Sequence, residues 1–383
     1  MKKALSFLLA LCLTLSVSMT AFASEKTTSD RVYEQIEGAV EFLTDGVDKY
    51  TVDQCKDFLP LIQSGADLDK YIDGFLASVK DNLDRNNGKL ITQYGESLAD
   101  YAAVISVLSE CGIDPEDFEG YNLVKPFTAL DPANTSFSPN YYHIIIPAAV
   151  FYADEAFAKA ICDTYVSEYY TMGKGVDYYG FSSDNTAYFI VAMSYYADEY
   201  QNVINDAYKV LETYKTDGGY FSNAQYSTEP NADSTALVLM AYSNAVDVPD
   251  EELEKYFEKV SSVYNDLCTF ESSKTGVFST DYNEFDSYAT KEALMSLTSY
   301  YFVALMQELY EEENSTEPST DKNNPASDND NKDDGGKTTA ADRNSSKKSP
   351  ATGAGAAYAA ASTALLGAGA AVLALSRKKN DIV

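Results

Sequence analysis

Two kinds of helical segment alternate along this chain. The segment "YQNVINDAYKVLETYK" (residues 200–215) places its apolar side chains on one stripe and its charges opposite, which is typical of a surface helix that covers a core. The segment "DSTALVLMAYSNA" (residues 233–245) is apolar around most of its circumference, so it must be buried between other helices. The alternation predicts an all-α fold with an outer and an inner layer of helices.

The inner type of segment recurs along the chain. The positions taken as equivalent are Ala103, His143, Ala187, Ala236 and Ala293, at spacings of roughly 40 to 57 residues. Drifting spacings of this size are typical of a helical-hairpin repeat with variable loops. With an earlier pair of helices over residues 31–43 and 52–62, about six hairpins and about twelve helices result, without a strand pattern. Because an open solenoid would leave its helices with a wet face, we expect a closed α/α toroid over residues 24–310.

Three stretches carry a family resemblance. They are "GVDYYGFSSDNTAYFIVAMSYY" (175–196), "KTDGGYFSNAQYSTEPNADSTALVLMAYS" (215–243) and "TGVFSTDYNEFDSYATKEALMSLTSYYF" (275–302). They resemble the repeat of the prenyltransferase and terpene-cyclase-like toroids, in which a Gly-Gly-aromatic turn leads to an Asp-x-Thr-Ala inner helix. Transcobalamin-type carriers and complement-type thioester domains share this toroid. The resemblance therefore implies the fold and leaves the function open.

The catalytic motifs of these families are absent from the sequence. It contains neither the Asp-x-Asp-Asp of the cyclases nor a Gly-Cys-Gly-Glu-Gln thioester. Asp266 and Cys268 imitate the zinc pair of the protein prenyltransferases, but the single histidine, His143, lies upstream, and catalytic zinc needs three protein ligands. His143 is either a base or a packed core residue. We expect no cofactor and no metal, while a pair of glycosidase carboxylates stays open among the many acids.

Aromatic and acidic residues stand in or just after the turns that precede the inner helices. The resemblance implies that these turns gather at one mouth of the toroid, where exposed aromatics suit an apolar or sugar ligand. The alternative for the aromatics is that they pack against neighbouring hairpins. The aspartates either face a ligand or cap helices. The candidate ligand-binding residues are Tyr178, Tyr179, Asp184, Tyr220, Asp233 and Tyr282. A glycan, a lipid or a cobalamin-like molecule each stays open as the ligand.

Charge and cysteines limit the partners and the chemistry further. The net charge of −31 repels nucleic acid, whose binding depends on Lys and Arg at the phosphates. Four cysteines follow the first segment of the chain: Cys55, Cys111, Cys162 and Cys268. Two disulfides and buried free thiols are both open for them.

The N-terminus predicts export. "MKKALSFLLALCLTLSVSMTAFAS" begins with two lysines, continues through an apolar run and ends on small residues. That order is typical of a signal peptide over residues 1–23, cleaved between Ala23 and Ser24.

The C-terminus predicts anchoring. Residues 311–348 are acidic and hold no large apolar residue, which predicts a disordered stalk. An SPATG motif, an apolar segment (354–376) and a basic end follow, and together they resemble a sortase sorting signal of the LPxTG type; the motif residues are Ser349, Pro350, Ala351, Thr352 and Gly353. The resemblance implies that a sortase cleaves between Thr352 and Gly353 and passes the threonine to peptidoglycan. A single apolar helix that remains in the membrane is the alternative.

The sequence as a whole predicts an exported protein of a Gram-positive bacterium, covalently anchored to the cell wall, whose toroid binds an extracellular ligand. Its expected partners are sortase and peptidoglycan, together with that ligand. Two alternatives stay open: a toroid enzyme that acts on a polysaccharide or an isoprenoid, and an adhesive or structural spacer.

Overall fold

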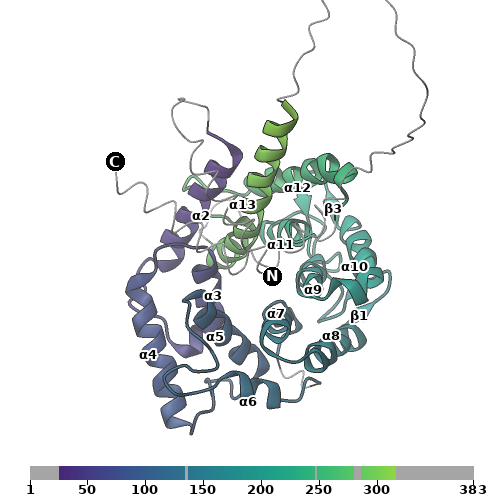
Figure 1. The fold of residues 1–383 in the computed structure, drawn as a ribbon. Helices are drawn as coiled ribbons and strands as arrows, with labels where there is room; N and C mark the ends of the chain where they lie inside the picture. The colour runs from purple at the N-terminus through teal and green to yellow at the C-terminus, as the bar shows by residue number, and fades with distance from the viewer. Residues whose placement is uncertain (1–25, 134–136, 246–247, 280–285, 316–383) are drawn as a thin grey trace, which may run out of the picture.

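The computed structural model describes residues 26–133, 137–245, 248–279 and 286–315. Within them, an inner ring of helices is closed by contacts between each helix and the next, and by a contact from the last to the first (Figure 1). The inner helices are α3 (Cys55–Gln63), α5 (Leu98–Glu110), α7 (Tyr142–Tyr152), α9 (Ser183–Ser194), α11 (Ala232–Ser243) and α13 (Ser287–Ser315).

Outer helices surround this ring. They are α2 (Thr28–Thr44), α4 (Asp69–Arg85), α6 (Val124–Ala129), α8 (Glu155–Tyr169), α10 (Ala197–Glu212) and α12 (Leu253–Cys268). Helices α6, α8, α10 and α12 each pack against the inner helix that precedes them in the chain, and α2 packs against α13. The first and last helical hairpins are thereby joined. The prediction of an all-α toroid with outer and inner layers is confirmed.

Burial follows the two sequence patterns. Helix α9 is buried along its run from Asn185 to Met193, whereas α10 buries one face that includes Ile204 and Leu211. Burying a side chain of this size contributes roughly 1.5–3 kcal/mol. The inner helices therefore form the core, and the outer helices cover it.

Short structures that the sequence did not predict join some of these helices. Strands β1 (Tyr170–Thr171) and β2 (Gly175–Val176) form one antiparallel hairpin, and β3 (Lys215–Thr216) and β4 (Gly219–Tyr220) form another. With two residues in each strand, they are too short for a period-2 pattern to be visible in the sequence. Single turns of 3-10 helix lie at η1 (Val52–Gln54), η2 (Pro139–Tyr141) and η3 (Asp250–Glu252).

One hydrogen bond recurs where three inner helices begin. A threonine in the first turn of the helix accepts it from a backbone N–H of the preceding segment. The pairs are Val176 N to Thr186 Oγ1 at 3.3 Å, Tyr220 N to Thr235 Oγ1 at 3.0 Å and Phe278 N to Thr290 Oγ1 at 3.1 Å. This bond accounts for the threonine of the repeated Asp-x-Thr or Tyr-x-Thr start, because it ties the incoming turn to the inner helix.

The sequence left disulfides and free thiols both open for the four cysteines. All four cysteines of the described chain are free, and burial raises the pKa of the Cys55 and Cys162 thiols to about 12.

Helix α13 continues through Ser315, so the predicted start of the stalk at residue 311 was too early. The predicted signal peptide, the rest of the predicted stalk and the predicted sorting signal lie outside the described residues. Among the helices that the structure does describe, none combines the length and the apolarity needed to cross a membrane.

Candidate functional site

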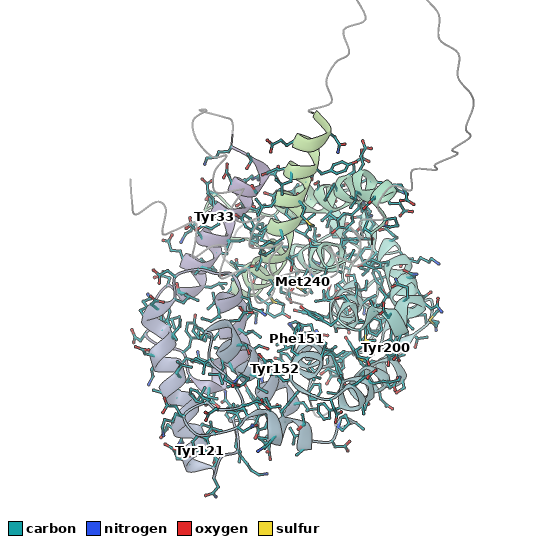
Figure 2. The ribbon with its side chains drawn as sticks, in the orientation of Figure 1. Tyr33, Tyr121, Phe151, Tyr152, Tyr200 and Met240 are labelled. Carbon is teal, nitrogen blue, oxygen red and sulfur yellow. The ribbon has the colours of Figure 1, made fainter. Side chains whose placement is uncertain are left out.

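A cavity of about 340 Å³ lies within the inner ring. Every inner helix contributes to its wall. Figure 2 shows Phe151, Tyr152 and Met240 near the centre of the ring, whereas Tyr33, Tyr121 and Tyr200 lie toward its outside. The lining residues are Leu59, Pro60, Gln63, Ser106, Ser109, Glu110, His143, Ile144, Pro147, Ala148, Phe151, Tyr152, Val191, Tyr195, Met240, Asn244, Met295, Thr298 and Ser299.

Much of the polar lining comes from the C-terminal ends of the inner helices. Gln63 is the last residue of α3, Glu110 of α5 and Tyr152 of α7. Tyr195 and Asn244 are the residues that follow α9 and α11. The cavity therefore lies toward the mouth at which the inner helices end, opposite the turns in which the ligand-binding residues were predicted.

Glu110 is the one carboxylate among the lining residues. Burial raises the pKa of this carboxyl to about 7. Its Oε2 atom and the Tyr195 hydroxyl are both buried, and neither has a hydrogen-bond partner among the described residues. Burial also raises the pKa of Tyr195, and the charge of Glu110 raises it further, so the two groups are close enough to interact. A ligand that supplied hydroxyl or amino groups here would satisfy both atoms.

Aromatic rings and neutral polar groups make up another part of the wall. The Phe151 side chain is 52% exposed and meets the Tyr195 ring edge-on, with 6.2 Å between the ring centroids. The Tyr152 hydroxyl hydrogen-bonds to Ser109 Oγ at 2.5 Å, and Asn244 Nδ2 donates to Ser299 Oγ at 3.2 Å. Aromatic faces beside fixed amide and hydroxyl groups are suited to a ligand that is apolar on one face and hydroxylated on its edge.

His143 lies at the start of α7 and lines the same cavity. Its Nδ1 hydrogen-bonds to the backbone carbonyl of Asn140, and its ring lies 4.7 Å from the Tyr188 ring. Because a carbonyl only accepts, Nδ1 carries the proton and Nε2 is an acceptor. Burial lowers the pKa of His143 to about 4, and the positive charge of Lys291 contributes to the decrease. The imidazole is therefore neutral at pH 7.

A buried acid lies behind Tyr188. The Tyr188 hydroxyl donates to Glu292 Oε1 at 3.2 Å, and Glu292 is 1% exposed. Burial raises the pKa of Glu292 well above its usual range, and the negative charges of Asp184 and Asp233 raise it further. Rings and carboxyls thus link the cavity to the mouth at which the inner helices begin.

Asp184 and Asp233 occupy equivalent places at that second mouth. Each is the second residue of its inner helix, and the side chains that cap these helices are those of Ser182 and Asn231. The capping role considered for the aspartates is therefore wrong. Asp184 accepts hydrogen bonds from Ser183 Oγ, at 3.1 Å, and from Ser222 Oγ. Their carboxylates still interact favourably with the helix N-termini.

The predicted aromatic residues are divided between surface and core. Tyr179 is 84% exposed, and its ring lies 4.5 Å from the ring of the half-buried Tyr178. Tyr220 is fully buried, and its hydroxyl accepts a hydrogen bond from Lys259 Nζ at 3.3 Å. It packs in the hairpin and is not available to a ligand at the mouth. Tyr282 lies outside the described residues.

The sequence interpretation did not predict the cavity residues, apart from considering His143. A signal was present: the inner segments are apolar, yet several end on or are followed by a polar or ring-bearing residue, such as Gln63, Glu110 or Asn244. A polar residue in line with a buried face points to a cavity. Within the part of the chain that the structure describes, no group of three His, Cys, Asp or Glu residues is arranged to hold a metal ion.

Comparisons with known proteins give no assignment. No protein-family model matches the chain, and no curated protein matches it. Among solved structures, it is similar to a chain described as "Glycosyl hydrolase family 88 from Bacteroides vulgatus", at 13% identity and a TM-score of 0.49, over 73% of this chain and 100% of that one. Similarity at this level assigns no activity.

Proposed function

We propose that the protein is an exported, cell-wall-anchored surface protein whose toroid binds a short carbohydrate in its central cavity. The observation that carries the proposal is the composition of the cavity wall. All the inner helices contribute to it, and it combines aromatic rings, amides and hydroxyls with a single carboxyl group. No Lys or Arg is among the described lining residues. Such a wall favours a neutral, hydroxylated ligand over an acidic one.

The size of the cavity narrows the ligand classes left open by the sequence. A volume of about 340 Å³ lies at the small end of the range for ligand pockets, roughly 300–1,000 Å³. A cobalamin-like molecule is far larger than this cavity. A lipid chain would leave the Glu110 and Tyr195 oxygen atoms without partners, at a cost of roughly 1–3 kcal/mol for each buried group. A sugar of one or two units supplies both the C–H face and the hydroxyls.

Binding is tested directly with the chain from residue 24 to residue 352, the form that signal peptidase and sortase would leave. We expect a neutral mono- or disaccharide from a panel to bind in isothermal titration calorimetry. Phe151→Ala and Glu110→Gln should each lower the affinity for that sugar at least tenfold. Met172→Ala is the control, because Met172 is an exposed apolar residue that does not line the cavity. Equal losses in all three variants, or no binding of any sugar, would rule the cavity out as a sugar site.

One observation favours an enzyme as the second candidate. A carboxyl whose pKa is about 7 is suited to general acid catalysis at neutral pH. Glycoside hydrolysis ordinarily needs a second carboxylate, however, and the described lining holds only Glu110. We therefore expect no release of reducing ends from the bound sugar or from polymers that contain it. Turnover that is lost in Glu110→Gln would favour the enzyme instead.

A further inference from the structure

Exposed tyrosines surround the mouth at which the inner helices begin. Tyr94, Tyr179 and Tyr226 lie in the segments that lead into α5, α9 and α11, and Tyr288 is the second residue of α13. Their exposed fractions are 76%, 84%, 81% and 55%, which makes them the most exposed tyrosines among the described large hydrophobic residues. All four mark the same end of the inner helices. They form what we term the tyrosine rim, at the end opposite the cavity.

Backbone hydrogen bonds fix the rim. Residues 92 and 95 exchange two bonds of 3.0 and 2.9 Å around Tyr94, and the Tyr226 N–H donates to the Asn223 carbonyl at 2.9 Å. The Tyr288 N–H donates to Asp286 Oδ1 at 2.9 Å. A turn whose backbone is held in place before a ligand arrives loses little entropy when its side chain binds that ligand.

Tyr179 adds backbone strain to the same surface. Its φ of 55° is in the left-handed region, which is rare for a bulky residue. The next residue, Gly180, donates its N–H to Asp177 Oδ1 at 3.2 Å and so holds the turn. Backbone strain beneath an exposed side chain is typical of functional sites.

The rim encloses negative charge. Asp184 and Asp233 lie in the first turns of α9 and α11. Burial raises the pKa of the Tyr288 hydroxyl, Glu292 raises it further, and the charges of Asp233 and Asp184 add to the increase. Two lysines beside these rings are already paired with carboxylates. Lys56 pairs with Asp100 and lies 5.6 Å from the Tyr94 ring centroid. Lys291 pairs with Asp57 at 3.0 Å and lies 5.3 Å from the Tyr288 ring.

We infer that the tyrosine rim binds a linear polysaccharide that carries free amino groups. Sugar rings pack on the phenol faces, and the ammonium groups lie over Asp184 and Asp233. Neighbouring inner helices are roughly 8–10 Å apart, so a chain of several sugars can reach more than one tyrosine. The tyrosines stand on separate turns, whereas a protein partner needs a continuous apolar patch within about 800 Å². The net charge of −31 disfavours acidic polymers. The inference is independent of the sugar site in the cavity.

The test uses three oligomers of equal length, added to residues 24–352 at about pH 6, where amino groups carry a proton. They are a glucosamine hexamer, its fully N-acetylated counterpart and a lysine hexamer. We expect the glucosamine hexamer to bind, and the neutral hexamer to bind at least tenfold more weakly. Tyr179→Ala and Tyr288→Ala should each lower the affinity for the glucosamine hexamer at least fivefold. Asp184→Asn should weaken it without changing the affinity for the neutral hexamer.

Two control variants separate binding at the rim from general charge attraction and from binding in the cavity. Asp198→Asn removes an exposed carboxylate from the start of α10, which lies at the opposite end, and should leave binding unchanged. Phe151→Ala alters the cavity and should also leave it unchanged. A lysine hexamer that binds as tightly as the sugar, with no effect of the tyrosine variants, would overturn the inference in favour of general charge attraction. If only Phe151→Ala lowers the affinity for the glucosamine hexamer, the hexamer binds in the cavity, and the inference of a binding site at the tyrosine rim is wrong.

Discussion

Gly219 and Thr235 approach each other so closely that no side chain larger than hydrogen fits between them. A Cβ atom on Gly219 would lie 2.6 Å from Thr235 Oγ1, the atom that accepts the Tyr220 N–H. The preceding hairpin repeats the arrangement: a Cβ atom on Gly175 would lie 2.3 Å from Thr186 Oγ1. The glycine and threonine of the repeated motif therefore serve a single contact between the incoming turn and the inner helix.

We expect Gly219→Ala to destabilise the fold more than Gly218→Ala does. Both glycines have positive φ, of 139° and 101°, but a Cβ at Gly218 meets nothing within 4 Å. Gly218→Ala should cost roughly 1–2 kcal/mol from its backbone conformation alone. Gly219→Ala adds the clash with Thr235, a further ~1–3 kcal/mol. Urea unfolding of the two variants measures the difference. Equal losses in the free energy of unfolding would show that the close approach to Thr235 does not destabilise Gly219→Ala.

The fold was readable from sequence because the toroid is built from a repeated pattern. The segment around Ala236 is apolar on all sides, as an inner helix requires. The segment around Leu211 is apolar on one side only, as an outer helix requires, so the two patterns predict the two layers. The Gly-Gly-aromatic turn is visible in the sequence, but the sequence leaves its aromatic residue open between the surface and the core. Tyr220 is buried because its own N–H is tied to Thr235, which turns the residue into the hairpin core.

The cavity was not readable because it depends on the closure of the ring. Glu110 is the last residue of α5, and the sequence around it gives no sign that Tyr195 lies close to it. Tyr195 follows α9, and helices α5 and α9 are not neighbours in the ring because α7 lies between them. By contrast, Tyr179 and Asp184 lie in one short stretch of chain, so the sequence alone indicates that they are close together.

Glu110 should make the protein less stable as the pH rises. Its pKa is about 7 in the folded state and 4.5 ordinarily, so the folded state holds the proton more tightly. The stabilising contribution is complete below about pH 4.5 and is lost as the pH rises through 7. Glu110→Gln, which cannot ionise, should match the parent near pH 4.5 and exceed it by on the order of 2–3 kcal/mol above pH 7. Chemical denaturation across this range measures it, and parallel pH profiles for the two proteins would contradict a buried carboxyl.

His143 gives the opposite pH dependence. Its pKa of about 4 is lower than the ordinary 6.5, so the neutral imidazole stabilises the fold above pH 6.5. That contribution should be lost as the pH falls through 4. The chain has one histidine, so its ring protons give a single set of NMR signals. We expect these signals to titrate with a midpoint near 4, and a midpoint near 6.5 would show that water reaches the ring freely. His143→Gln should remove the loss of stability in this window.

Thr352 tests the proposed anchoring of the protein by a sortase. If a sortase cleaves after this residue, its carbonyl becomes the acyl group that is transferred to peptidoglycan, and the chain beyond it is lost. Thr352→Ala should therefore move the protein from the cell-wall fraction to the membrane fraction, and mass spectrometry should find residues 354–383 still attached. Ser345→Ala is the matched control, because it changes a neighbouring hydroxyl residue outside the SPATG motif and should leave the wall fraction unchanged. Wall-extracted parent protein that retains residues 354–383 would contradict cleavage at Thr352 and favour a permanent apolar anchor.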